Sequence, residues 1–270
     1  MKILEQLECL QFTGRGDIVV YTAIIDGYDE LCNPPMVDGI DYVCFTDDEN
    51  FTSEKWHIVH VPFSYRDPRR LAKLFKLLPH MLFPNYRYSV WMDGSLKLKG
   101  NFDELLKSYC LDANMTVFPH PKRDCIYDEG VACLRLGKDT STVIEQQLYR
   151  YRTAGYPRHN GLIAGTILVR KHNEKSVRRL MEAWWQEVDI YSVRDQLSFN
   201  YVAWSNGFEY SVLPFRLDDN KYFLWDGHRK FVFYDHRGKR KVSLRLFCSG
   251  VYNKICLSIK SYRGRNTHDK

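Results

Sequence analysis

The residues best placed for chemistry are Asp93 and Gly94, which follow a run of apolar and aromatic residues over 86–92. A run of this composition, bounded by a glycine-containing turn, is typical of a buried strand. In open α/β sheets, ligands bind outside the carboxyl ends of the strands. We therefore expect the Asp93 carboxylate to lie in a ligand site at the edge of a sheet.

Two other strands carry candidate residues. Residues 17–25 form an apolar run that predicts a central strand, with Thr22 inside it and Asp26 directly after it. A strand that ends in this way is common at the floor of a nucleotide pocket, and it is equally common at an ordinary strand end. Residues 162–170 predict another buried strand, in which Gly165 indicates the close approach of a backbone or a ligand.

A basic helix is predicted just before the Asp93 strand. It spans residues 68–81, because Pro68 is tolerated in a first turn and apolar residues recur at helical spacing behind it. Arg69, Lys73 and Lys76 recur at intervals of three and four residues, so they share one face of this helix. These cations could reach a nucleotide diphosphate, and an ordinary solvated face explains the same charges as well.

Further candidates lie downstream. His120 and Arg123 follow a strand predicted over residues 115–118. Asp195 and Gln196 fall near the start of a helix predicted over residues 192–202. A carboxylate in a first turn is favoured by the helix dipole, which gives Asp195 a purely structural explanation. A carboxylate can also act as a general base for a hydroxyl group.

The composition bounds the class of protein. A chain of 270 residues with 44% hydrophobic residues is long enough for one large α/β domain. Residues 221–270 hold 13 Lys and Arg against 3 Asp and Glu, which leaves the first 220 residues with a net charge of −4. We therefore predict an α/β catalytic domain over residues 1–215 and a basic, aromatic C-terminal extension over residues 216–270.

The sequence lacks the motifs that mark several classes of enzyme. The chain has no GxGxxG after a strand, no P-loop motif, no serine nucleophile elbow and no HExxH helix. The eight cysteines show neither zinc-ribbon nor disulfide-framework spacing, which favours reduced thiols and a cytoplasmic location. No signal peptide is recognisable, and no window approaches the apolar length of a membrane span.

The candidate acidic and basic residues suit the transfer of a sugar from a nucleotide-diphosphate donor. The leaving diphosphate gains charge in the transition state, and a divalent cation at Asp93 or nearby Lys and Arg side chains would stabilise it. Mn²⁺ or Mg²⁺ would need only one or two protein ligands, because phosphate and water supply the others.

Four segments of the sequence resemble a known family. They are the turn at Asp93 and residues 69–80, 120–124 and 192–199, within a region of roughly residues 17–210. They are similar to the glycosyltransferase-like domain family of plant mucilage-related and turgor-defect proteins, which has bacterial relatives in surface-polysaccharide loci. The resemblance implies a GT-A fold, in which a nucleotide-sugar-binding sheet is flanked by helices, with the donor bound at Asp93.

The metal is the point at which the sequence departs from GT-A enzymes. The corresponding turn in those enzymes is often Asp-x-Asp, and here the third position is Ser95. Asp93 could hold the cation together with phosphate and a distant ligand, His228, or the basic residues could replace the metal. A surface histidine in a glycine turn is the alternative explanation for His228.

We therefore predict a glycosyltransferase that extends a cell-surface glycan or glycolipid. Asp195 and Gln196 are the expected catalytic residues, and His120 and Arg123 are expected to bind the acceptor. The expected donor-binding residues are Thr22, Asp26, Arg69, Lys73, Asp93, Gly94 and Gly165.

Two other functions remain as alternatives. In the glycosyltransferase, the basic extension could contact an anionic membrane from the cytoplasmic side. One alternative function is a nucleic-acid-binding module that uses this extension. The net negative charge of the first 220 residues would repel phosphate chains, so we expect no nucleic acid partner. A lipid amide hydrolase is the other alternative, because plant relatives are linked to ceramide breakdown, but the sequence offers no matching cluster of Ser, Cys or His.

Overall fold

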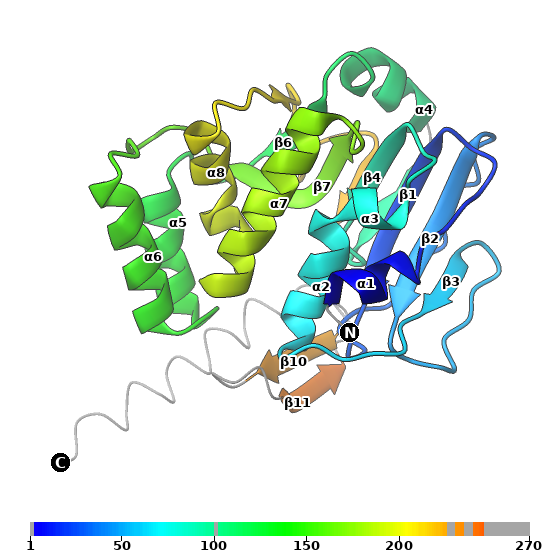
Figure 1. The fold of residues 1–270 in the computed structure, drawn as a ribbon, viewed down its shortest axis with the longest axis horizontal. Helices are drawn as coiled ribbons and strands as arrows, with labels where there is room; N and C mark the ends of the chain where they lie inside the picture. The colour runs from blue at the N-terminus through cyan, green and yellow to red at the C-terminus, as the bar shows by residue number, and fades with distance from the viewer. Residues whose placement is uncertain (1–2, 100–101, 226–229, 235–239, 246–270) are drawn as a thin grey trace.

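A computed structural model describes residues 3–99, 102–225, 230–234 and 240–245 of the chain (Figure 1). Its centre is a seven-stranded sheet with the strand order β3-β2-β1-β4-β7-β6-β8. These strands are β1 (Ile18–Ile24), β2 (Ile40–Thr46), β3 (His57–His60), β4 (Tyr88–Met92), β6 (Met115–Pro119), β7 (Ile163–Arg170) and β8 (Ser211–Val212).

The sheet is mostly parallel. Strands β1, β2, β3 and β4 pair in parallel, and β7 runs antiparallel between β4 and β6. All five residues of β4 are buried, as expected for a strand covered on both faces. The carboxyl end of β4 and the amino end of β7 therefore meet at one edge of the sheet, where Asp93 follows β4.

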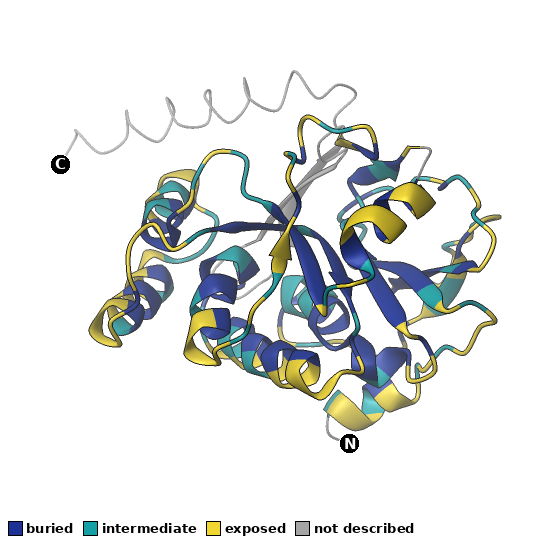
Figure 2. Cartoon of the chain, turned by 90° about the horizontal axis from the view of Figure 1, so that it is seen from above, coloured by how far each residue is buried: buried dark blue, intermediate teal, exposed yellow. Residues whose placement is uncertain are grey.

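Helices cover both faces of the sheet (Figure 2). The helical segments are α1 (Ile3–Glu8), α2 (Pro68–Leu77), α3 (Pro79–Leu82), α4 (Phe102–Leu105), a π-helical turn (Leu106–Cys110), α5 (Ile126–Leu136), α6 (Ser141–Thr153), α7 (Lys175–Ile190), a 3₁₀ turn (Asp195–Leu197) and α8 (Phe199–Ser205). Tyr21 and Trp91 face the core under α2 and α7, whereas Val20 and Val90 face the other core. The predicted α/β class, a single sheet flanked by helices, is confirmed.

Two predicted helices differ from the structure. The helix expected over 68–81 ends at Leu77, and a second short helix begins at Pro79. Proline has no backbone N–H and its ring disfavours the helical conformation of the residue before it, so the helix is interrupted at Leu78. The helix expected over 192–202 is also wrong in its start, because Asp195 opens a 3₁₀ turn and α8 begins only at Phe199.

Beyond residue 215 the chain still contributes to the body of the protein. Strand β9 (Phe223–Trp225) pairs with β5 (Leu96–Leu98), and Leu217 and Tyr222 are buried in the second core. A hairpin of β10 (Lys230–Tyr234) and β11 (Arg240–Arg245) follows. Most of the basic extension lies outside the described residues, so the division at residue 215 stays a prediction.

The structure also bears on the predictions of reduced thiols and of no membrane-spanning segment. Cys9, Cys32, Cys44, Cys110, Cys125 and Cys133 are free thiols. Among the described residues, no helix combines the length and the apolar composition needed to cross a membrane.

Candidate active site

Helix α2 brings two lysines to the edge of the sheet. Asp67 caps its start by accepting a hydrogen bond from the Arg69 backbone N–H at 2.9 Å. Lys73 and Lys76 follow on one face, and the Lys76 side chain is only 1% exposed. The Lys76 carbonyl accepts hydrogen bonds from the Tyr21 hydroxyl and the Arg170 guanidinium, at 3.0 and 2.8 Å. These contacts fix the backbone that carries the buried ammonium group.

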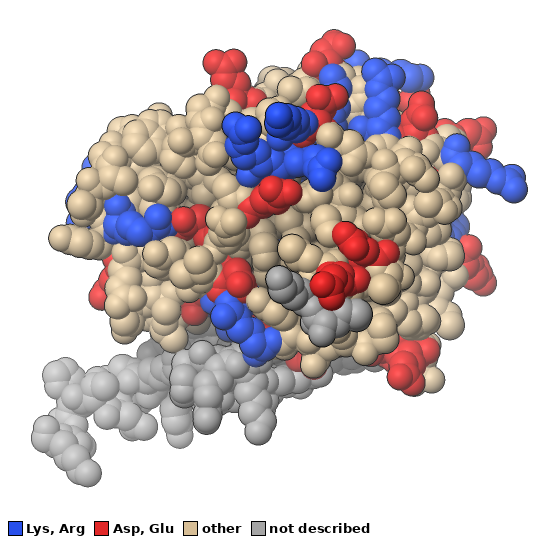
Figure 3. Space-filling model, in the orientation of Figure 1, with Lys and Arg blue, Asp and Glu red and all other residues tan. Residues whose placement is uncertain are grey.

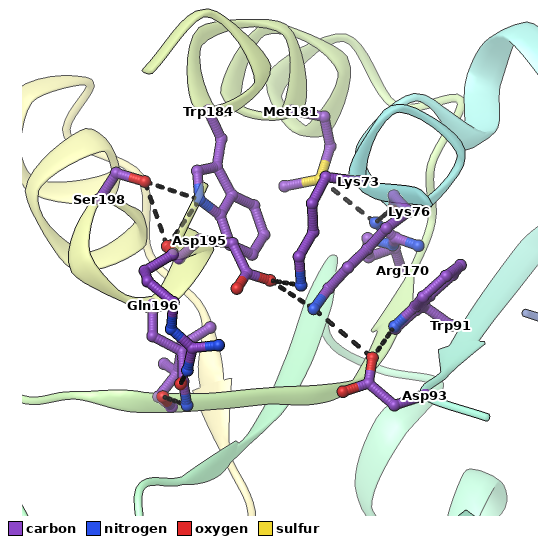
Figure 4. A network of polar contacts seen from close by, with 12 residues as sticks. Lys73, Lys76, Trp91, Asp93, Arg170, Met181, Trp184, Asp195, Gln196 and Ser198 are labelled. Carbon is purple, nitrogen blue, oxygen red and sulfur yellow. Dashed lines mark hydrogen bonds and ion pairs between the residues drawn. The ribbon is translucent and has the colours of Figure 1, made fainter. Parts of the chain in front are cut away.

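Both lysines bind the carboxylate of Asp195. The Asp195 Oδ2 atom lies 2.5 Å from the Nζ atom of Lys76 and 3.0 Å from that of Lys73 (Figure 4). The Asp195 side chain is 3% exposed, so the pairs are shielded from water. Trp184 donates a hydrogen bond from Nε1 to the Asp195 carbonyl at 3.0 Å, which holds the 3₁₀ turn against α7. The structure therefore brings Lys73 and Asp195 together, as residues of one site.

Asp93 joins the same cluster through Lys76. The Nζ atom of Lys76 lies 3.8 Å from Asp93 Oδ1, which also accepts a hydrogen bond from Trp91 Nε1 at 2.6 Å. The Asp93 backbone N–H donates to the carbonyl of Thr166 at 2.9 Å, which ties the end of β4 to β7. With a side chain 27% exposed, Asp93 is the most accessible member of this cluster of Lys73, Lys76, Asp93 and Asp195, which we call the lysine–aspartate cluster.

Two glycines border the lysine–aspartate cluster. A Cβ atom at Gly165 would lie 3.2 Å from both Asp195 Oδ2 and Lys76 Nζ, so a side chain there would crowd the ion pairs. A Cβ atom at Gly94 would lie 2.4 Å from the Ile24 side chain. Both glycines therefore allow close packing at the carboxyl edge of the sheet, which agrees with the close approach predicted for Gly165.

The charges of the lysine–aspartate cluster shift its pKa values. Burial alone would raise the pKa of Asp195, but Lys73, Lys76 and Arg194 together hold it well below the ordinary range of a carboxyl group. Burial lowers the pKa of Lys73 to about 8, against the opposing charge of Asp195. At neutral pH Asp195 is therefore ionised and Lys73 carries its proton.

A second polar group lies at the start of α5. His120 Nδ1 accepts hydrogen bonds from the backbone N–H groups of Lys122 and Arg123, at 3.2 and 3.0 Å. Arg123 Nε donates to Glu129 Oε2 at 2.6 Å, and His120 Nε2 lies 3.7 Å from the same oxygen. Burial lowers the pKa of His120, against the opposing charge of Glu129, so the ring favours its neutral form. His120 and Arg123 thus share one carboxylate.

Gln196 and Arg194 lie between the two groups. Gln196 donates from Nε2 to the carbonyl of Ile163 at 3.2 Å and accepts from Arg194 Nη2 at 3.0 Å. Burial lowers the pKa of Arg194, but the charges of Cys133, Asp195 and Glu129 raise it above its ordinary value. Arg194 therefore lies within electrostatic range of both the lysine–aspartate cluster and the His120 group.

Other predicted site residues lie apart from these contacts. Thr22 follows Tyr21, whose hydroxyl reaches Lys76, so strand alternation directs Thr22 to the opposite face of the sheet. The Asp26 backbone N–H donates to the Asp47 carboxylate, and Arg69 pairs with Asp67 at 2.7 Å. His228 lies outside the described residues.

Several residues of the site were not predicted from the sequence. Lys76 was placed on the basic helix face but not assigned to the site, and Glu129 was not considered. The signal for Lys76 was its three-residue spacing from Lys73, and that for Glu129 was an acidic first turn in α5. Arg194 stands directly before Asp195 and Trp91 two residues before Asp93, but nothing in their spacing distinguishes them.

The loops that follow β1 and β2 line a separate, open pocket of about 440 Å³. The residues that line it are Leu31, Asn33, Phe51, Thr52, Ser53 and Glu54. It combines apolar side chains with amide, hydroxyl and carboxylate groups, as small-molecule sites commonly do.

A family model for the TOD1/MUCI70 glycosyltransferase-like domain matches residues 8–213. The chain belongs to this family. It is 30% identical to the probable hexosyltransferase MUCI70 of Arabidopsis thaliana over 74% of this chain and 38% of that protein. It is 24% identical to the alkaline ceramidase TOD1 of the same plant over 68% of this chain and 48% of that protein. The chain thus spans less than half the length of both relatives.

Two solved structures are also similar. They are the apo bifunctional glycosyltransferase WbbM (TM-score 0.41, 13% identity, 75% of this chain and 39% of that chain) and apo mouse xyloside xylosyltransferase 1 (TM-score 0.41, 12% identity, 73% and 84%). Similarity at this level adds nothing to the family assignment.

The lysine–aspartate cluster makes a prediction about stability. Asp195→Asn removes the charge that compensates Lys73 and Lys76, and breaking a buried ion pair in this way costs about 3–5 kcal/mol. The free energy of unfolding, measured with urea, should fall by that amount. Asp103→Asn is the control, because Asp103 forms an exposed pair with Lys107 at 2.7 Å. Equal, small effects of the two substitutions would contradict the buried pairing.

Proposed function

We propose that this domain transfers a sugar from a nucleotide-diphosphate donor to a glycan or glycolipid acceptor. The observation that carries the proposal is the lysine–aspartate cluster at the carboxyl edge of the sheet, where α/β proteins bind their ligands. Membership of a glycosyltransferase-like family supports the same reaction class, and so does the name of the relative MUCI70. Synthesis of a surface polysaccharide is the role that we propose for the whole protein.

Lys73 and Lys76 would act on the leaving diphosphate. Breaking the bond between the sugar and the diphosphate leaves negative charge on the phosphate oxygens, which fixed ammonium groups stabilise without having to reorganise. Lys76 is anchored through its carbonyl and is nearly fully buried, so its charge is held in place before the donor binds. The pocket between the loops after β1 and β2 would accept the nucleoside part of the donor.

Asp195 is better suited to positioning than to proton transfer. A general base works best when its pKa lies near the operating pH, and the pKa of Asp195 is held well below the ordinary range. Its carboxylate instead fixes the directions of the two ammonium groups. We therefore propose that Asp195 positions Lys73 and Lys76, and that Gln196 contacts the transferred sugar beside Gly165.

The acceptor would lie on the side of His120 and Arg123. This segment follows β6, and Arg194 lies within electrostatic range of both this segment and the lysine–aspartate cluster. Because Nδ1 accepts from two backbone N–H groups, a neutral His120 ring carries its proton on Nε2 and could donate it to the oxygen of an acceptor hydroxyl group.

Asp93 is the residue that would hold Mn²⁺ or Mg²⁺. It is an accessible carboxylate, and such a cation needs few protein ligands when phosphate is present. The ion would neutralise the developing charge of the diphosphate. Ser95, at the position where a second aspartate often stands, is buried.

Thermal unfolding with a panel of nucleoside diphosphates tests the proposal. One diphosphate should raise the melting temperature, and Mn²⁺ should increase that shift because Asp93 would hold the ion and the ion would neutralise charge on the diphosphate. Asp93→Ala should abolish the effect of the cation, whereas the control Asp103→Ala should leave it unchanged. Indifference to every nucleotide, with and without Mn²⁺, would contradict the proposal. Release of fatty acid from ceramide without any nucleotide would favour a hydrolase instead.

The pKa of Lys73 predicts a dependence on pH. Because this pKa is about 8, Lys73 is charged below pH 8 and loses its charge above it. The affinity for the diphosphate, measured by calorimetry, should therefore fall roughly tenfold above that pH, the value of one hydrogen bond to a charged group. Lys73→Arg keeps its charge and should remove the decline. A decline that persists in this variant would assign it to another group.

The basic extension leads to a proposal about location. Residues 221–270 carry 13 Lys and Arg against 3 Asp and Glu, with aromatic residues among them. The face of the described residues in Figure 3 carries both basic and acidic side chains. We propose that the extension contacts an anionic membrane from the cytoplasmic side.

Co-sedimentation with lipid vesicles tests this location. The full chain should bind vesicles that contain anionic phospholipid and should dissociate as salt is added, because screening weakens the attraction. Vesicles of neutral phospholipid are the control. Equal binding to both kinds of vesicle, or tight salt-sensitive binding to RNA in preference to vesicles, would overturn the proposal.

A further inference from the structure

A thiol, a carboxylate and an imidazole meet outside the lysine–aspartate cluster. One ligand atom each from Cys125, Asp128 and His159 lies within 4.8 Å of the other two. Cys125 precedes α5 and Asp128 lies in its first turn, whereas His159 belongs to the loop between α6 and β7. The group thus joins two segments that are separated along the chain by the whole of α6.

We propose that Cys125, Asp128 and His159 form a zinc site. A thiolate favours Zn²⁺ over Mg²⁺ or Ca²⁺, and imidazole and carboxylate complete a set of ligands that zinc commonly takes. Three protein ligands leave a fourth tetrahedral position for water. This site is distinct from the proposed cation site at Asp93, whose oxygen ligand and phosphate partner suit a harder ion.

The spacing of the ligand atoms fits a site that closes slightly on binding. Tetrahedral zinc with bonds of about 2.0 Å to nitrogen and 2.3 Å to sulfur holds its ligand atoms about 3.5 Å apart. Because the three atoms already lie within 4.8 Å of one another, they need to approach by about 1.3 Å at most. Side-chain rotation can supply this movement, because Asp128 and His159 are partly exposed. Binding requires the thiolate, so the Cys125 thiol releases its proton to solvent as the metal–sulfur bond forms.

The neighbouring contacts prepare His159 for this role. Its Nδ1 atom lies 2.8 Å from Asp124 Oδ1, and a metal-binding histidine usually has its other nitrogen hydrogen-bonded to a carboxylate in this way. The His159 backbone has a φ of 55°, in the left-handed region, which is uncommon for a residue other than glycine. Asp128 Oδ1 accepts from Arg158 at 2.7 Å, which leaves its second oxygen for the metal.

Zinc would lock the α6–β7 loop to the start of α5. The two segments already share a hydrogen bond from the Tyr127 hydroxyl to the Tyr156 carbonyl at 2.7 Å, in addition to the contacts of Arg158 and His159. Arg123 and Glu129, which are paired, flank Cys125 along the chain. The site would therefore stabilise the segment that carries His120 and Arg123, whatever that segment binds.

Metal content tests the zinc site directly. The full chain, purified from cells grown with added zinc and dialysed against metal-free buffer, should retain about one zinc ion by mass spectrometry. Cys125→Ser and His159→Ala should each lose it, whereas the control Cys9→Ser, at an exposed cysteine, should retain it. Asp124→Asn should weaken zinc binding at least about tenfold, since it removes the partner of the ligating ring.

Cobalt binding gives a spectroscopic signal that reports a bond between the metal and the Cys125 thiolate and not the folding of the chain alone. Co²⁺ added to the zinc-free chain should produce a thiolate-to-cobalt charge-transfer band that Cys125→Ser abolishes and Cys9→Ser preserves. Circular dichroism shows whether each variant is folded before metal is added. Absence of zinc from the full chain together with absence of this band, or equal zinc content in folded His159→Ala, would overturn the proposal. Neither outcome depends on nucleotide binding or on sugar transfer.

Discussion

The buried pairing of Lys76 with Asp195 is the interaction on which the candidate active site depends. Both side chains are almost fully buried, and moving either charge from water into the protein interior costs several kcal/mol unless the other is present. Their proximity is therefore required of any conformation in which α2 packs on the sheet. It fixes the end of α2, the 3₁₀ turn at Asp195 and the amino end of β7 relative to one another.

The surrounding packing serves this constraint. Tyr21 and Arg170 bind the carbonyl of Lys76, and Trp184 binds the carbonyl of Asp195, so the backbone of each partner is held independently of its charge. Gly165 lies where a Cβ atom would approach both charged groups. Three strands and two helices thus converge on one ion pair, and the accessible Asp93 extends that pair toward the edge of the sheet.

The sequence predicts the local features of this site and not the contacts across it. The strand before Asp93 and the one around Gly165 are recognisable because long apolar runs indicate buried strands, and both are confirmed. The pairing of Lys76 with Asp195 joins residues 119 positions apart, so no local pattern reveals it. The explanation of Asp195 by the dipole of a helix over residues 192–202 was wrong. The residue opens a 3₁₀ turn, and the two lysines stabilise its carboxylate. Pro79, which interrupts the basic helix, is a local signal in the sequence that this helix ends before it.

The charge balance of the lysine–aspartate cluster affects how a divalent cation would bind at Asp93. The ammonium groups of Lys73 and Lys76 face the carboxylates of Asp93 and Asp195, so the formal charges of the four side chains cancel. A diphosphate that drew the ammonium groups toward itself would leave the two carboxylates unpaired in a partly buried site, which is costly. A divalent ion at Asp93 would supply the missing positive charge and free Lys76 for the phosphate. In the proposed reaction, the lysine–aspartate cluster would therefore favour binding the nucleotide-sugar donor together with a divalent cation.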